Sequence, residues 1–220
     1  MKYPNFRQEK KLWRKGYKKV VGLDEAGRGS LSGPVTAAAV VINSSFKFQV
    51  LGLEYLKDSK KLTPKKREEF YKILTNHPQI KWGIGKVSEK VIDRINILEA
   101  TKLAMIKAIK KLKRKPDFLI IDGNFKLNLL IPQKSIIKAD EKVFSCTVAS
   151  IIAKVYRDRI MRRYHKKYSQ YGFDKHKGYP TKQHCKMLKK YGPCKIHRKT
   201  FRPIKILTKF FISSKLNLAR

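Results

Sequence analysis

Three observations predict an α/β fold for this chain of 220 residues. Short apolar segments with the character of buried strands alternate with longer segments of helical period. Three of the apolar segments end in an aspartate, at Asp24, Asp122 and Asp140. Hydrophobic residues make up 42% of the chain, which is enough to bury a substantial core. Length and composition together predict one compact domain with a small appended helical part.

The N-terminal half is expected to hold three strands and one helix. Residues 19–24 are apolar and β-branched and predict a buried strand. The small residues of 33–42 predict a second, closely packed strand, and 82–87 predict a third. Thr63 is a suitable N-cap, and Pro64 a suitable first residue, for a helix that runs through about residue 74.

The C-terminal half is expected to add two helices and two strands. Ser88 is predicted to cap a long helix. Its apolar residues recur at roughly helical spacing: Ile92, Ile95, Leu98, Leu103, Ile106 and Ile109. Residues 118–123 and 135–140 predict a fourth and a fifth strand, each with a carboxylate at its end, and 143–163 predict a second helix.

Four carboxylates are expected to converge at one edge of the sheet: Asp24, Glu25, Asp122 and Asp140. A single aspartate at a strand end is more often a turn residue, and a lone acidic pair often caps a helix. Carboxylates packed together repel, and their pKa values rise unless a cation is present. Oxygen ligands suit Mg²⁺ or Mn²⁺, whereas zinc calls for His or Cys. The repeated pattern therefore predicts a site for two divalent ions of the kind that catalyse phosphoryl displacement.

A Gly-Arg-Gly segment, Gly27-Arg28-Gly29, follows the acidic pair almost directly. Glycines let a backbone approach a ligand closely and expose its N–H groups. This segment favours a ligand site over a simple helix cap.

The charge balance predicts a polyanionic partner. The chain has 53 Lys+Arg and 16 Asp+Glu, a formal net charge of +37. From Lys154 to Arg220 there are 21 lysines and arginines but only two acids, Asp158 and Asp174. A solvated lysine-rich surface explains part of such an excess, but its concentration in one third of the chain favours a nucleic-acid footprint.

The remaining composition excludes some classes and disfavours others. No stretch approaches the length of a membrane span, and the N-terminus lacks an apolar signal segment. Three cysteines without a CxxC pair fit a reducing compartment, so a cytoplasmic protein is expected. His184-Cys185 with Cys194 and His197 lacks the paired ligand spacing of a zinc site.

Taken in order, the motifs of this chain resemble the ribonuclease HII family, the type 2 ribonucleases H. The similar blocks are 22–29 with 33–35, 58–62, 121–124, 138–140 with 149–158, 176–181, and 197–201. Together they span roughly residues 20 to 203. Ser30, Ala139 and Val148 depart from the common pattern, but none of these differences removes a carboxylate.

The resemblance implies a fold and an activity. The fold is the RNase H-like fold, a five-stranded mixed sheet flanked by helices, with a helical C-terminal part. The expected domain covers residues 1–203, with a basic helical region from about 165, followed by a tail or short helix over 204–220. The implied enzyme is an endonuclease of DNA replication and repair. It hydrolyses the phosphodiester 5′ to ribonucleotides in RNA–DNA hybrids and at RNA–DNA junctions in duplex DNA, and leaves 3′-hydroxyl and 5′-phosphate ends.

The resemblance also implies residue roles. The four carboxylates Asp24, Glu25, Asp122 and Asp140 hold two Mg²⁺ or Mn²⁺ ions. Gly27, Arg28 and Gly29 read the ribose 2′-hydroxyl, and Tyr179 stacks on the sugar of the next deoxynucleotide, although an aromatic there also suits core packing. The residues expected to bind backbone phosphates are Ser59, Lys60, Lys61, Ser150, Lys154 and Lys177. For each lysine alone, a solvated surface role remains the alternative.

Three alternatives remain open at this point. Ribonuclease HIII resembles this family in fold but differs in the loop after its Asp-Glu pair. A basic nucleic-acid-binding protein of ribosomal type would explain the charge, but has no use for four acids at strand ends. A strand-transferring polynucleotidyl transferase shares acid-held metals, but should not require the Gly-Arg-Gly segment.

The tail over 204–211 has two interpretations. Its apolar residues resemble the hydrophobic anchor of peptides that bind sliding clamps, although Ile204 stands where that motif has glutamine. Leu207, Phe210 and Phe211 also have the spacing of one helix face that packs back on the domain. A monomer without membrane association is expected in either case.

Overall fold

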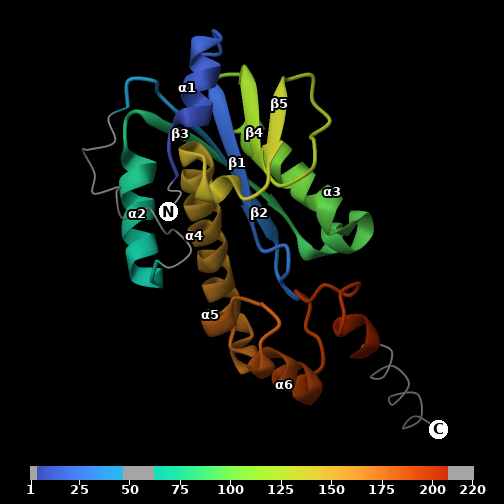
Figure 1. Cartoon of the computed structure of the whole chain (residues 1–220). Coiled ribbons are helices and arrows are strands. Elements are labelled where there is room, and N and C mark those ends of the chain that lie inside the picture. Colours follow the sequence, from blue (N-terminus) through green and yellow to red (C-terminus); the bar gives the residue numbers. More distant parts are fainter. Residues whose placement is uncertain (1–3, 47–61, 208–220) are drawn as a thin grey trace, which may run out of the picture. The chain divides into compact units, whose positions relative to one another are not determined.

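A computed structural model describes residues 4–46 and 62–207 of the chain (Figure 1). These residues form two compact units, and each is described separately. We call the first the sheet unit; it comprises Met1–Ala26, Thr36–Lys86 and Thr101–Val155. We call the second the helical unit; it comprises Gly27–Val35, Val87–Ala100 and Tyr156–Arg220.

The sheet has five strands in the order β3-β2-β1-β4-β5. The strands are β1 (Val20–Ala26), β2 (Val35–Ile42), β3 (Ile80–Val87), β4 (Phe118–Asp122) and β5 (Gln133–Ile136). β1 pairs antiparallel with β2 and parallel with β4, and β4 pairs parallel with β5. The predicted five-stranded mixed sheet is confirmed.

The described residues form six α-helices. They are α1 (Arg7–Arg14), α2 (Pro64–Asn76), α3 (Glu89–Lys110), α4 (Phe144–Lys167), α5 (Phe173–His176) and α6 (Lys182–Tyr191). Thr63 caps α2 as predicted, since its hydroxyl accepts from the Lys66 N–H at 3.3 Å. The sequence pattern predicts α3 as one continuous helix, but Asn96 interrupts it with a φ of 64°. The Asn96 Oδ1 accepts from the N–H groups of Leu98 and Glu99 and so starts the helix anew.

Helices cover both faces of the sheet. Trp82 and Ile84 of β3 pack against the cluster that includes Phe70 of α2 and Ile152 of α4. Gly83 and Gly85 alternate with them and face α3, where an added Cβ would overlap the carbonyls of Ala108 and Ala104. Because successive side chains of a strand point to opposite faces, α2 and α4 lie on one face and α3 on the other.

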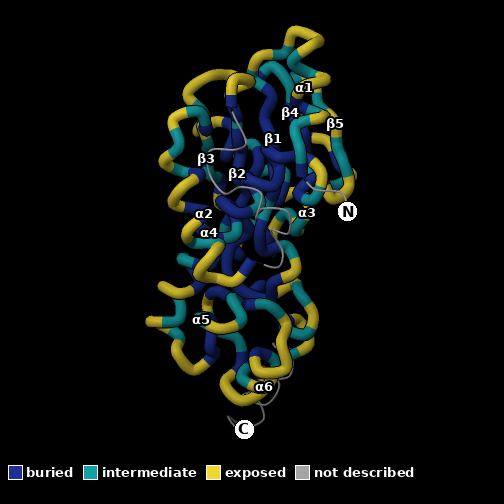
Figure 2. The backbone as a smooth tube through the Cα atoms, turned by 60° about the vertical axis from the view of Figure 1, so that its left-hand side comes forward, coloured by how far each residue is buried: buried dark blue, intermediate teal, exposed yellow. Residues whose placement is uncertain are grey.

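Close packing between β1 and α4 depends on a glycine. A Cβ at Gly22 would lie 2.5 Å from the Ser145 backbone carbon, so only glycine lets the strand approach the start of α4. Figure 2 shows β1 and β2 as buried along almost their whole length and the outer turns of the helices as exposed. The close contact at Gly22 is on the same face of β1 as Asp24, because residues two apart in a strand share a face.

The fifth strand is shorter than the sequence predicts. The sequence predicts an extended segment over 135–140, but β5 ends at Ile136. Lys138 adopts the left-handed conformation with a φ of 57° and ends the extended run. Ala139–Glu141 then form a 3₁₀ turn, η3. Asp140 therefore lies on a turn after the strand, which corrects the predicted strand end.

The helical unit has its own apolar core. Phe173, Leu188 and Ile204 are fully buried in it, together with Met161 of α4. Within the described residues, no helix is both long enough and apolar enough to span a membrane.

Candidate active site

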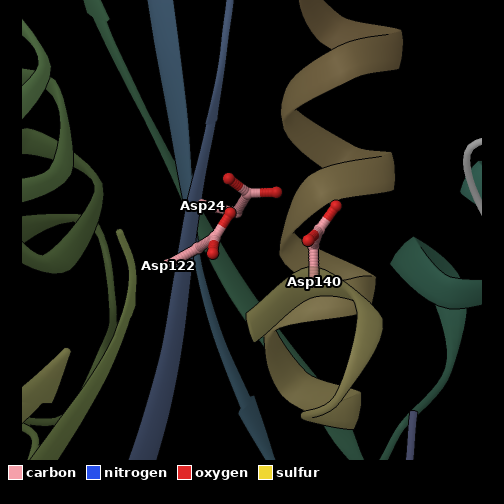
Figure 3. A group of neighbouring side chains, drawn as sticks. All are labelled: Asp24, Asp122 and Asp140. Carbon is pink, nitrogen blue, oxygen red and sulfur yellow. The ribbon is translucent and has the colours of Figure 1, made fainter. Parts of the chain in front are cut away.

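Three aspartates meet in the sheet unit. Asp24 comes from β1, Asp122 from the end of β4 and Asp140 from η3 (Figure 3). Each offers a carboxylate oxygen, and these oxygens all lie within 4.8 Å of one another. The convergence predicted from the strand ends is confirmed for these three residues.

Local structure explains this placement. The parallel register pairs Leu23 with Ile121, so the next residues along, Asp24 and Asp122, lie side by side. The Asp122 Oδ1 accepts from the Ala139 N–H at 2.7 Å and thereby holds the turn that carries Asp140. The Thr147 hydroxyl donates to the Asp140 carbonyl at 2.7 Å and ties that turn to α4.

Glu25 is outside this group of three. It follows Asp24 on β1, and successive strand side chains point to opposite faces. Its charge still acts on the site. Burial is the largest cause that raises the pKa of Asp24 well above its usual range, and the charge of Glu25 is the next, followed by Asp122 and Asp140.

The donor set fits a hard divalent cation. Asp24 and Asp140 are each only 4% exposed, so their charges are poorly screened by water. A cation among the three carboxylates would relieve both the desolvation and the repulsion that raise the pKa of Asp24. Three oxygen ligands suit Mg²⁺ or Mn²⁺ better than zinc. The three aspartates can therefore hold a metal ion.

The histidines and cysteines form no comparable group. His184 and His197 do meet, with 3.1 Å between their Nε2 atoms. Among the residues that the structure describes, however, the aspartates are the only set of three or more side chains placed to share an ion.

The Gly-Arg-Gly segment lies in the helical unit. Gly27 has a φ of 97°, and a Cβ there would overlap the Arg157 guanidinium, so this position requires glycine. Gly29 is exposed, and a Cβ there would meet nothing within 4 Å. The backbone at Gly29 is therefore open to a ligand.

Tyr179 is in the same unit, in the loop between α5 and α6. The Gly178 carbonyl accepts from the Leu31 N–H at 2.8 Å, so this loop contacts the segment that continues from Gly29. The Arg157 guanidinium carbon lies 5.5 Å from the centroid of the Tyr179 ring, within cation–π range. The ring is half-buried. The two segments expected to read the sugar are thus brought together.

The predicted phosphate-binding residues are more dispersed. Ser150 and Lys154 lie half-buried on α4, within the sheet unit. Lys177 lies in the helical unit, where its ammonium donates to the carbonyls of Asp174 and Lys175. Ser59, Lys60 and Lys61 lie outside the described residues.

The tail begins as a packed segment. Ile204 is fully buried in the core of the helical unit, and Leu207 packs against that core. Both contacts agree with the packing interpretation of the tail. Phe210 and Phe211 lie outside the described residues.

Sequence reasoning gave no role to Arg157, Arg198, His184 and His197, although three of them stand in the quoted motif blocks. All four are buried in the helical unit. The sequence offered one signal, namely that three of these polar residues stand in the motif blocks. That the two arginines are buried is visible only in the folded chain.

Solved structures of ribonucleases H are similar to this chain. Ribonuclease H2 from Pyrococcus horikoshii OT3 is 29% identical with a TM-score of 0.72, over 88% of this chain and 99% of that chain. Ribonuclease HII from Archaeoglobus fulgidus, solved in complex with PCNA, is 27% identical with a TM-score of 0.71. The match covers 84% of this chain and 95% of that chain. Bst-RNase HIII, solved with Mn²⁺, is 17% identical with a TM-score of 0.65, over 87% and 70%, and shows similarity of fold alone. Fold and site define an α/β protein of the ribonuclease H class with an acidic metal centre.

Curated relatives give the particular family. Ribonuclease HII of Chlamydia trachomatis serovar L2 is 51% identical over 197 residues, which are 90% of this chain and 88% of that protein. Ribonuclease HII of Bacillus velezensis is 50% identical over 191 residues, 87% and 72% of the two chains. The family model described as Ribonuclease HII matches residues 21–204. The chain belongs to the ribonuclease HII family and is an enzyme of that family, as its motifs predict.

Proposed function

We propose that this chain is an endonuclease that cuts the phosphodiester on the 5′ side of a ribonucleotide in RNA–DNA hybrids and at RNA–DNA junctions in duplex DNA. Its products carry a 3′-hydroxyl and a 5′-phosphate. The observation that supports this most directly is the aspartate triad, with carboxylate oxygens within 4.8 Å of one another, in a chain of this family.

We propose Asp24, Asp122 and Asp140 as the main metal ligands, with Glu25 as the fourth carboxylate of the site. Two Mg²⁺ or Mn²⁺ ions bound there would supply an activated water and stabilise the charge that develops on the leaving oxygen. The protein side chains have simpler tasks. Asp24 and Asp140 offer buried carboxylate oxygens as ligands, and the 2.7 Å bond from the Ala139 N–H orients Asp122.

Ribose recognition is proposed for the helical unit. The open backbone at Gly29 is suited to donate an N–H to the 2′-hydroxyl, which alone distinguishes RNA from DNA at a given sugar. Arg28 adds a side-chain donor, and the ring of Tyr179 offers a flat surface for the neighbouring deoxyribose. In this mechanism the 2′-hydroxyl is recognised but does not attack the phosphate.

Affinity for the duplex is proposed to come from basic residues. Ser59, Lys60, Lys61, Ser150, Lys154 and Lys177 are the proposed phosphate contacts. The net charge of +37 supports this assignment, because lysines and arginines that neutralise phosphates release counterions. We propose that the two units act as one catalytic domain over residues 1–203, as a monomer in the cytoplasm.

The tail remains a candidate contact for a sliding clamp. The Archaeoglobus fulgidus relative was solved in complex with PCNA. In this chain the burial of Ile204 supports packing for the start of the tail. A clamp contact would therefore have to use residues after Ile204.

One cleavage assay tests the proposed function. A labelled duplex with a single ribonucleotide is incubated with the protein and Mg²⁺, Mn²⁺ or EDTA, next to the matched all-DNA duplex. We expect a single cut on the 5′ side of the ribonucleotide with either metal and none with EDTA. A polymerase should extend the new 3′ end. A cut on the 3′ side that leaves a cyclic phosphate would show attack by the 2′-hydroxyl and would contradict the mechanism.

A further inference from the structure

Two arginines of the helical unit are completely buried. Arg157 lies on α4 and Arg198 follows α6, and both are 0% exposed. A buried guanidinium is costly unless its N–H groups are satisfied. Burial lowers the pKa of Arg198 to about 9, so it still carries its charge at pH 7. The chain retains two buried cations here, and their partners indicate the reason.

Arg198 binds the carbonyls of the Gly-Arg-Gly segment. Its Nη2 donates to the Gly27 carbonyl at 2.7 Å and its Nη1 to the Arg28 carbonyl at 2.8 Å. Its Nε donates to the Gly33 carbonyl at 3.0 Å. One guanidinium therefore holds the backbone at both ends of the segment from residue 27 to residue 33.

These bonds set the direction of the backbone N–H groups. In a trans peptide the carbonyl of one residue and the N–H of the next point in opposite directions. Since the carbonyls of Gly27 and Arg28 point at Arg198, the N–H groups of Arg28 and Gly29 point away from it. Gly29 is exposed. The arginine thus directs two backbone N–H donors away from itself, one of them at the exposed Gly29.

Arg157 joins this segment to the loop that carries Tyr179. Its Nε donates to the Pro34 carbonyl at 2.8 Å, its Nη2 to the Ser32 carbonyl and its Nη1 to the Lys177 carbonyl, both at 3.0 Å. Its guanidinium also faces the Tyr179 ring at 5.5 Å. Arg157 therefore bridges residues 27–34 and the Tyr179 loop.

A neutral histidine pair provides a second tie. The His197 Nδ1 accepts from the Cys194 N–H at 2.8 Å, so its proton is on Nε2, which donates to the His184 Nε2 at 3.1 Å. His184 then donates from Nδ1 to the Tyr179 carbonyl at 2.9 Å. Burial lowers the pKa of His184 to about 4 and that of His197 to about 3. His197, the residue next to Arg198, is thus linked through His184 to the backbone of Tyr179.

We propose that Arg157 and Arg198, with the His184–His197 pair, are positioning residues that hold the Gly-Arg-Gly segment and Tyr179 in one fixed arrangement before substrate binds. The inference rests on the proposed function, because it assigns the arrangement to recognition of the ribose. It adds that selectivity for a ribonucleotide depends on buried residues that do not touch it.

The test variant is Arg198→Lys. Lysine keeps the positive charge, but its single nitrogen cannot serve all three carbonyls at the Arg198 geometry. Affinities are measured for a duplex with one ribonucleotide and for the matched all-DNA duplex, in an Asp122→Asn background that prevents cleavage. We expect the preference for the ribonucleotide duplex to fall about tenfold, since the variant cannot form all the hydrogen bonds of the charged guanidinium. The affinity for the all-DNA duplex should stay unchanged. Protein that carries Arg198→Lys alone, without Asp122→Asn, should bind Mn²⁺ as wild type does.

Arg163→Lys is the matched control, because Arg163 lies on α4 like Arg157 but is exposed. It should keep the wild-type preference. An unchanged preference in folded Arg198→Lys protein would overturn the inference. A wild-type protein without any preference would instead refute ribose reading itself, so the two failures are distinct.

A measurement on the unmodified protein covers the case in which Arg198→Lys does not fold. The Leu31 and Gly33 N–H groups donate to the carbonyls of Gly178 and Ile196, each at 2.8 Å. If the arrangement is fixed before substrate binds, both amides should be strongly protected from hydrogen exchange in the free protein. Rapid exchange at both positions would overturn the inference.

Discussion

The sheet unit and the helical unit both bury charged side chains, but they compensate these charges in different ways. In the sheet unit, Asp24 lies next to Asp122 and Asp140, and its pKa is raised by burial and by the charges of Glu25 and these two aspartates. In the helical unit, Arg157 and Arg198 make six hydrogen bonds, and each acceptor is a backbone carbonyl. The carboxylates of the first group repel one another and can hold a cation, whereas the guanidinium groups of the second are hydrogen-bonded to backbone carbonyls.

This difference separates a ligand site from a scaffold. Buried like charges destabilise the folded protein until a counterion binds, so they favour metal binding. Buried charges that are bonded to carbonyls stabilise one arrangement of the backbone around them. This difference supports our proposal that the sheet unit carries the chemistry and the helical unit the recognition of the ribose.

The largest expected effect follows removal of one metal ligand. Asp24→Asn or Asp122→Asn should abolish cleavage with Mg²⁺, because the amide removes a negative charge from the triad. Binding to the duplex should stay nearly unchanged. The measurement is single-turnover cleavage of a duplex with one ribonucleotide, together with its affinity.

Asp117→Asn is the matched control for these two variants. Asp117 is also in the sheet unit, but its carboxylate accepts from the N–H groups of Lys18 and Lys19 and lies outside the triad. This variant should cleave normally. Wild-type turnover in Asp24→Asn or Asp122→Asn would refute the metal-site assignment.

A smaller effect is expected from the recognition side. Tyr179→Ala should lower turnover at a single embedded ribonucleotide about tenfold or more, because stacking on an aromatic ring contributes about 1–3 kcal/mol. Overall duplex affinity should change much less. Tyr191→Ala removes an exposed tyrosine of the same unit and serves as the control. Equal decreases of turnover and affinity in Tyr179→Ala would break the proposed division of roles.

Charge removal should have the opposite signature. Lys186, Lys189 and Lys190 are exposed on α6. Replacing all three by Ala should weaken binding to every duplex and flatten the salt dependence by up to about one unit for each phosphate that is no longer neutralised. Selectivity for the ribonucleotide should remain. A selective decrease at the ribonucleotide would place recognition in α6 and not in the Tyr179 loop.

The smallest effect on cleavage is expected from the tail. Truncation after Pro203 removes Ile204, which is fully buried, and Leu207, which packs against the same core. The melting temperature should fall and apolar surface should become exposed, since a buried isoleucine contributes about 1.5–3 kcal/mol. If the truncated protein keeps its stability but no longer binds its cognate sliding clamp, the tail is a partner motif instead.

Much of the metal site could be predicted from the sequence, because parallel strands bring their ends together. That rule placed Asp24 beside Asp122 correctly. It placed Asp140 near them for the wrong reason, since the left-handed Lys138 ends the strand early and a 3₁₀ turn carries the aspartate. It could not separate Glu25 from the triad without knowing which face each side chain of β1 occupies.

The scaffold of the helical unit could not be predicted in the same way. Arg157 and Arg198 are 41 positions apart in the sequence, in a region rich in exposed lysine and arginine. Nothing in their local pattern distinguishes a buried guanidinium from a solvated one. Their partners are backbone carbonyls, which have no sequence signature. Only the fold shows that these two cations are structural.

Thermal unfolding of wild-type and Asp24→Asn protein, compared across pH and with or without Mn²⁺, tests the central claim most directly. The pKa of Asp24 is raised in the folded state, so its stabilising contribution is present below the unfolded pKa and is lost as the pH rises through the folded value. Metal-free Asp24→Asn should therefore have a higher melting temperature than wild type at pH 7. Each kcal/mol of repulsion that the substitution relieves should raise the melting temperature by about 2–4 °C. The difference should vanish near pH 3, and saturating Mn²⁺ should stabilise wild type more than the variant. A metal-free variant that melts below wild type at pH 7 would contradict the account of mutually repelling buried carboxylates.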